Sequence, residues 1–143
     1  MKHILLPLLT LGLALLTACS SLIAPSRPLE ITLESTGMHY QPSTFEVTAG
    51  EPVKLTLRNS DSVDHDFSIM EIPLMSMGAT GEPMAGHEMG EMAVDPQLHM
   101  AAAMNASNSF EFTPTKAGTY EFFCTVPGHK EAGMVGTMIV RAP

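Results

Sequence analysis

Short stretches in which apolar and polar residues alternate run through most of the chain from residue 29 to residue 142. A period of two is the spacing of β-strands, whose successive side chains point to opposite faces of a sheet. Turn-forming Gly, Pro, Asn and Asp residues separate many of these stretches, as expected of strands joined by short loops. The stretches are residues 29–35, 45–49, 53–59, 65–69, 109–113, 119–124 and 136–142. Together they predict an all-β fold, an antiparallel β-sandwich.

The segment of residues 70–106 interrupts this pattern and is rich in methionine. A connection of this length without secondary structure is uncommon and is usually functional. In its second half, Asp95 can cap a helix, Pro96 suits the first turn, and Asn105 can end the helix. The intervening residues 97–104 favour helix by their composition. We therefore predict a Met-rich, partly helical insertion between two strands.

A short run near the C-terminus places a cysteine, a histidine and a methionine in one segment that also contains Gly and Pro. These residues are Cys124, His129 and Met134, and they follow one another at steps of five. Thiolate, imidazole and thioether are soft or borderline donors. Their presence on a single loop predicts a metal site.

Strand alternation predicts that two donors point into the sandwich. Cys124 shares a face with Tyr120 and Phe122, and aromatic residues normally face the core. By the same argument, His65 shares the inward face of its strand with Phe67. Both donors stand at strand ends, so we expect them to meet at one pole of the sandwich.

Two imidazoles and a thiolate in a trigonal arrangement, with a weak thioether above them, form the blue, or type 1, copper pattern. Zinc is the rival metal, but structural zinc rarely uses methionine. A dinuclear copper centre would need a second cysteine in this loop, and a Cys–His nucleophile would leave the other donors without a role. We therefore predict one copper ion bound by His65, Cys124, His129 and Met134.

The N-terminus predicts export. A basic residue precedes an apolar run that is shorter than the roughly 20 residues of a membrane span. The run ends in Leu-Thr-Ala followed by Cys19, which resembles a bacterial lipobox. We expect residues 1–18 to be a lipoprotein signal peptide, Cys19 to be lipidated, and residues 19–28 to be a tether before the domain of residues 29–143. Ordinary signal cleavage just before the cysteine is the alternative.

The cysteine count and the charge narrow the remaining possibilities. The chain has two cysteines, and lipidation of Cys19 would leave Cys124 as a lone thiol without a disulfide partner. A free thiol in an oxidising compartment is a liability unless something such as a metal holds it. The net charge of −8 argues against a nucleic-acid-binding surface.

Residues 29–143 resemble the cupredoxins, the small blue copper proteins that include plastocyanin, azurin, rusticyanin and auracyanin. The loop has the spacing C-x4-H-x4-M, which is closest to auracyanin and rusticyanin. Residues 45–50, 53–59 and 112–124 also match the family pattern. The resemblance implies a Greek-key sandwich, one copper ion and outer-sphere electron transfer, with His129 as the ligand at the solvent edge.

One residue beside the donors departs from the family pattern. Many members carry Asn directly after the first histidine, where it ties the two ligand loops together, whereas this chain has Asp66. Asp66 could bond Thr125 in the same way, and its charge would stabilise Cu(II) and lower the reduction potential. Together with Asp61 and Asp64, it is otherwise expected to belong to a solvated loop.

The methionine-rich half of the insertion has three interpretations. Methionine can fill an irregular apolar surface, or form a pliable docking face for a redox partner. It can also bind Cu(I) together with histidine, in which case the candidate donors are Met84, His87, Met89 and Met92.

Taken together, these features predict a monomeric, non-enzymatic electron carrier. It would be exported and lipid-anchored to the bacterial membrane, on the periplasmic or extracytoplasmic face. Its partner would be a redox protein such as a cytochrome or an oxidase or reductase complex, and not a nucleic acid. The alternative is a copper chaperone or store that uses the Met/His segment. A redox enzyme would need an open coordination position, and Met134 argues against one.

Overall fold

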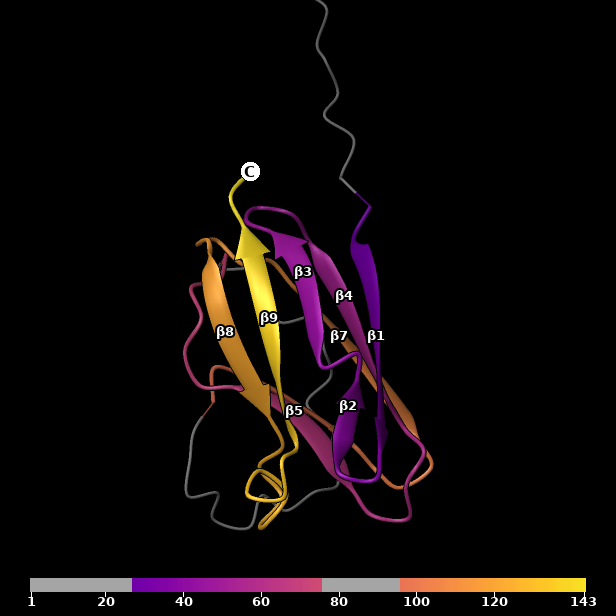
Figure 1. The fold of residues 1–143 in the computed structure, drawn as a ribbon. Helices are drawn as coiled ribbons and strands as arrows, with labels where there is room; N and C mark the ends of the chain where they lie inside the picture. The colour runs from indigo at the N-terminus through magenta and orange to yellow at the C-terminus, as the bar shows by residue number, and fades with distance from the viewer. Residues whose placement is uncertain (1–26, 76–95) are drawn as a thin grey trace, which may run out of the picture.

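The protein folds as two β-sheets packed face to face (Figure 1). The computed structural model describes residues 27–75 and 96–143, so the predicted signal peptide, Cys19 and residues 76–95 of the predicted insertion lie outside it. Nine strands form within the described residues. They are β1 (Leu29–Thr36), β2 (His39–Gln41), β3 (Thr44–Thr48), β4 (Val53–Asn59), β5 (His65–Ile69), β6 (Leu98–Ala102), β7 (Ser107–Phe112), β8 (Gly118–Phe123) and β9 (Val135–Arg141).

The all-β prediction is confirmed, but the sandwich is mixed and not purely antiparallel. One sheet has the strand order β2-β1-β4-β7 and the other β3-β9-β8-β5-β6. Two neighbouring pairs, β1 with β4 and β3 with β9, run parallel. The chain leaves the first sheet after β2, forms β3 in the other sheet and returns as β4. Because no hairpin joins β1 to β4, nothing in their connection requires antiparallel pairing.

The core lies between the sheets and follows the predicted alternation. In β4, Val53, Leu55 and Leu57 are fully buried, and in β9 Met138 and Val140 are buried. Burial of each such side chain contributes roughly 1.5–3 kcal/mol relative to leaving it in water. The two-residue period therefore supplies the apolar surface that holds the sheets together.

Residues 98–102, which lie within the predicted helical part of the insertion, form the strand β6 and not a helix. β6 pairs antiparallel with β5, with Met100 opposite Phe67. Leu98, Met100 and Ala102 are buried and the residues between them are only partly so, which is strand periodicity. The alanine-rich composition favours helix by a few tenths of a kcal/mol per residue, and tertiary pairing with β5 outweighs that preference. None of the described residues forms a helix long and apolar enough to cross a membrane.

Candidate metal centre

Three of the four predicted donors meet at the end of the sandwich opposite the C-terminus (Figure 1). His65 is the first residue of β5, Cys124 directly follows β8, and His129 lies in the loop before β9. Their donor atoms all lie within 4.8 Å of one another. His129 Nδ1 is 3.2 Å from His65 Nδ1 and 3.4 Å from Cys124 Sγ. Such separations suit donors that each bind one ion at about 2.0–2.3 Å.

Burial shapes the chemistry of these donors. His65 and Cys124 are fully buried, whereas 8% of His129 is exposed, which agrees with its expected place at the solvent edge. Burial and the nearby Asp66 raise the pKa of the Cys124 thiol to about 12. Burial, and next the charge of His65, lower the pKa of His129. The imidazole of His129 is therefore neutral near pH 7, as metal binding requires.

Met134 is held beside the other donors by its backbone. Its N–H donates to the His129 carbonyl at 2.9 Å, and its own carbonyl accepts from the Cys124 N–H at 3.2 Å. The Met134 side chain is fully buried. The loop therefore closes on itself so that its first and last predicted donors are joined by a hydrogen bond.

Tight turns give this loop its shape. Gly128 and Gly133 have φ angles of 86° and 101°, a region that glycine enters at little cost. The His129 N–H donates to the Val126 carbonyl at 3.0 Å, and the Ala132 N–H donates to Gly128 at 3.0 Å. The predicted Gly- and Pro-containing loop thus places His129 by local hydrogen bonds.

Asp66 ties the strand of one donor to the loop of another, as predicted. Its carboxylate accepts hydrogen bonds from Thr125 N at 2.9 and 3.1 Å and from Thr125 Oγ1 at 2.7 Å. Ser68 Oγ donates to it at 2.9 Å. Asp66 is only 3% exposed, so its assignment to a solvated loop is wrong. The hydrogen bonds from these donors offset the cost of burying the carboxylate in the core.

Asp61 contacts a donor residue, which the sequence did not reveal. Its Oδ2 lies 2.8 Å from His65 Nε2 and accepts from the Gly37 N–H at 2.8 Å. The hydrogen bond with His65 lowers the pKa of Asp61. The spacing of four residues between Asp61 and His65 was the one feature of the sequence that could have indicated this contact. An acidic residue in a polar loop does not, however, show by itself which way its side chain points.

Asn59 organises the loop that precedes His65. Its Nδ2 lies within hydrogen-bonding distance of the carbonyls of Val63, Ala102 and Ala103, at 2.7, 3.0 and 3.1 Å. Its Oδ1 accepts from the Asp61 N–H at 2.9 Å. This buried amide therefore joins the loop before β5 to the end of β6.

An aromatic cluster lies directly behind Cys124. The ring of Phe122 lies 5.0–5.5 Å, centroid to centroid, from those of Tyr40, Phe45 and Phe67. Phe122 and Cys124 belong to the same buried core cluster, two residues apart along the chain. The predicted inward direction of Phe122 and Cys124 is confirmed by their complete burial.

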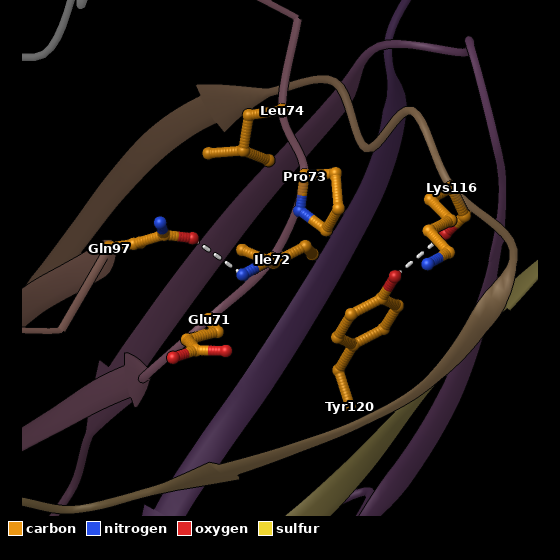
Figure 2. Close-up of a pocket in the computed structure, with 7 residues that line it drawn as sticks. All are labelled: Glu71, Ile72, Pro73, Leu74, Gln97, Lys116 and Tyr120. Atoms are coloured by element: carbon orange, nitrogen blue, oxygen red, sulfur yellow. Dashed lines mark hydrogen bonds between the residues drawn. The ribbon is translucent and has the colours of Figure 1, made fainter.

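A separate pocket of about 590 Å³ lies elsewhere on the molecule and includes none of the three donors (Figure 2). Gln97 Oε1 accepts from the Ile72 N–H at 2.6 Å, and the Tyr120 hydroxyl donates to the Lys116 carbonyl at 2.9 Å. The Gln97 side-chain oxygen and the Tyr120 hydroxyl are thus bonded within the protein, and the charged residues Glu71 and Lys116 also line the pocket. The candidate donors Met84, His87, Met89 and Met92 lie outside the described residues.

The fold is that of the blue copper proteins. Dithionite-reduced auracyanin from Roseiflexus castenholzii superposes with a TM-score of 0.60 at 22% identity, covering 80% of this chain and 98% of auracyanin. Auracyanin A from Chloroflexus aurantiacus gives 0.55 at 23% identity, covering 80% of this chain and all of the other. These likenesses establish the cupredoxin architecture.

Sequence comparison assigns the chain to a family. The profile of copper binding proteins of the plastocyanin/azurin family matches residues 28–141, and the chain belongs to that family. The copper-resistant cuproprotein CopI of Rubrivivax gelatinosus is 32% identical, over 80% of this chain and 67% of CopI. Lettuce plastocyanin is 30% identical, over 73% of this chain and 90% of its own length. With the His-Cys-His cluster, this makes copper the cofactor, one ion per chain.

Proposed function

We propose that this protein carries single electrons, using a type 1 copper ion bound by His65, Cys124, His129 and Met134. The observation that supports this most directly is the buried convergence of one sulfur and two imidazole nitrogens within 4.8 Å. His65 begins β5, and the other three donors lie in the hydrogen-bonded loop between β8 and β9, so their positions are set by the fold.

The donor set suits a one-electron role. Bound copper supplies a centre that is stable as both Cu(I) and Cu(II), because thiolate and imidazole tolerate both states. The buried, hydrogen-bonded side chains resist rearrangement, which keeps the reorganisation on electron transfer small. His129 is the donor with some exposure, and a redox partner would therefore approach at its ring.

Membrane attachment is part of the proposal. The apolar N-terminal run ending in Cys19 supports export and lipidation. A lipid tether would confine the carrier to the membrane surface and raise its encounter rate with membrane-associated redox proteins. Mass spectrometry of the N-terminal peptide tests this, since a diacylglycerol on Cys19 is expected. An unmodified N-terminus and release into the soluble fraction would refute it.

Spectroscopy tests the ligand set. The copper-loaded protein, purified from its host, is expected to be intensely blue or green through charge transfer from the Cys124 thiolate. Cys124→Ser should abolish the colour, whereas Met134→Leu should keep colour and metal while raising the reduction potential. A colourless oxidised copper form with Cys124 intact would refute the type 1 assignment, and complete loss of metal in Met134→Leu would refute its axial role.

A second candidate function is copper handling. Two relatives are named copper-resistant cuproproteins, from Rubrivivax gelatinosus and Pseudomonas aeruginosa, the latter 28% identical over 81% of this chain. Copper stoichiometry separates the two functions. One ion per chain, unchanged on deleting residues 75–92, favours the carrier. Additional ions lost with that deletion, and rapid transfer to a copper acceptor, favour handling.

We also propose that the protein is not an enzyme, because Met134 would occupy the position that a substrate needs on the metal. Titration of the oxidised copper protein with azide tests this. An unchanged visible spectrum is expected, and a new ligand-to-metal band at millimolar azide would point to an open position and a catalytic role.

A further inference from the structure

Asp61 and His65 form a contact on the outer side of the donor cluster. Asp61 Oδ2 lies 2.8 Å from His65 Nε2, and the His65 side chain is fully buried whereas 23% of the Asp61 side chain is exposed. The other ring nitrogen, His65 Nδ1, lies 3.2 Å from His129 Nδ1. The two ring nitrogens of His65 therefore face opposite sides: Nδ1 faces the other donors and Nε2 faces the Asp61 carboxylate.

This arrangement decides where the His65 proton resides. An ionised carboxylate can only accept a hydrogen bond, so Nε2 must be the nitrogen that carries the proton. The lone pair of Nδ1 then faces the other donors and is free to bind a metal. Asp61 thus selects the tautomer of His65 that copper binding requires.

The carboxylate is itself held in place. Asp61 Oδ2 accepts from the Gly37 N–H at 2.8 Å, which joins it to the turn between β1 and β2. The Asp61 N–H donates to Asn59 Oδ1 at 2.9 Å, and the Asp61 carbonyl accepts from the Asn105 N–H at 3.1 Å. Three segments of the chain therefore fix Asp61, so its contact with His65 does not depend on a freely rotating side chain.

We propose that Asp61 is a positioning residue that fixes the His65 ring and biases the bound copper towards Cu(II). This inference rests on the proposed ligand set. A carboxylate on the outer nitrogen makes a histidine ligand more basic and holds its orientation. Its negative charge also interacts more favourably with a doubly than with a singly charged ion, so the reduction potential is lower with Asp61 than without its charge.

The test compares two substitutions that remove the same charge from the same loop. Asp61→Asn keeps an amide oxygen that can accept from His65 but removes the charge. Asp64→Asn is the matched control, because the Asp64 carboxylate accepts from the Met104 backbone N–H at 2.9 Å, whereas the Asp61 carboxylate contacts the His65 ring. Both variants are loaded with copper, and the Cu(II) and Cu(I) dissociation constants are measured by competition with chelators. The reduction potential is measured by redox titration of the thiolate absorption.

Asp61→Asn is expected to weaken Cu(II) binding about 10–100-fold, with a smaller loss for Cu(I). The potential should rise by about 59 mV for each tenfold difference between these losses. Asp64→Asn should change either constant by less than about threefold, because the partly exposed Asp64 carboxylate bonds the Met104 backbone and not a donor side chain. Equal shifts in both variants, or none in Asp61→Asn, would overturn the inference.

A measurement on the unmodified protein covers the case in which Asp61→Asn does not fold. In the Cu(I) form, ¹⁵N NMR of the histidine rings should find the His65 proton on Nε2, protected from exchange. A proton that exchanges freely, or an unprotonated Nε2, would overturn the inference while leaving the ligand set intact. A wild-type copper protein without the thiolate absorption would overturn the ligand set itself, and this inference with it.

Discussion

The backbone N–H of Asp66 donates a hydrogen bond to the sulfur of Cys124 at 3.4 Å. The same residue accepts from Thr125 through its carboxylate, so it contacts both the sulfur and the residue that follows it. A buried negative charge therefore lies beside a thiol that must become a thiolate to bind copper. This relationship connects the geometry of the site to its redox and acid–base behaviour.

The charge of Asp66 should lower the reduction potential of the bound copper. In Asp66→Asn, the amide oxygen can still accept from Thr125 N, and the hydroxyls of Thr125 and Ser68 can rotate to accept from the new NH₂ group. We expect a rise of at least about 59 mV, a tenfold change in the relative affinity for the two oxidation states, with the colour retained. Redox titration measures it. Glu121→Gln, which removes an exposed charge paired with Lys130, is the control, and a shift as large there would contradict a local effect.

The metal-free thiol should be unusually unreactive. With a pKa of about 12, Cys124 is protonated at pH 8, whereas an exposed cysteine has a pKa near 8.5. Alkylation by iodoacetamide should therefore be slow in the folded protein and fast in urea. Copper binding should release a proton from Cys124, measurable by calorimetry in buffers of different ionisation enthalpy. Rapid alkylation of the folded, metal-free protein would contradict this.

The same raised pKa should make metal-free stability depend on pH. The folded state retains the Cys124 proton above the pH at which the unfolded state loses it. The stabilisation is therefore complete below about pH 8.5 and is lost progressively as the pH rises towards 12. By pH 10 the loss should be on the order of 2 kcal/mol, seen in urea unfolding at pH 7 and pH 10. Cys124→Ser is the control and should lack this component of the pH dependence.

Gly136 should tolerate no side chain. A Cβ there would lie 2.2 Å from the Phe122 ring and 2.7 Å from the Ser43 carbonyl oxygen. Gly136→Ala should cost about 1–3 kcal/mol or more in unfolding free energy through overpacking, and should displace Phe122 beside Cys124. Gly118→Ala is a milder comparison, since its nearest contacts are 3.3 Å away on the Tyr120 ring. Thermal unfolding measures both, and equal melting temperatures would contradict the prediction.

Asn59 should stabilise the loop that carries Asp61. Asn59→Ala leaves the carbonyls of Val63, Ala102 and Ala103 without this donor, which should cost about 1–3 kcal/mol. It should also weaken copper binding, because Asp61 N loses its acceptor. Asn108→Ala is the matched control, since Asn108 Nδ2 donates to the adjacent Ala101 carbonyl at 2.9 Å. Asn108→Ala is expected to lose less stability and to keep its copper affinity. A similar loss of copper affinity in both variants would contradict the role of Asn59.

What the sequence determined by itself was local. The two-residue period identified most of the strands and the inward direction of Cys124 and His65, because side-chain direction in a strand depends only on position along it. The spacing of Cys124, His129 and Met134 indicated the metal and the family, because these donors share one loop. Even the tie between Asp66 and Thr125 followed from the residue that directly succeeds the first histidine.

Only the tertiary structure decided the features that depend on distant partners. Residues 98–102 form a strand because β5 offers a pairing edge, which overrides a weak local preference for helix. The parallel pairs of β1 with β4 and β3 with β9 arise from crossings between sheets that no strand pattern records. Asp66 lies in β5 and not in the solvated loop expected of it, because Thr125 supplies its hydrogen bonds, whereas Asp61 stays in that loop and is held there by His65 and Gly37. The hydrogen-bond partners and the burial of a polar side chain depend on segments that are distant in the sequence, so they are decided only when the whole chain has folded.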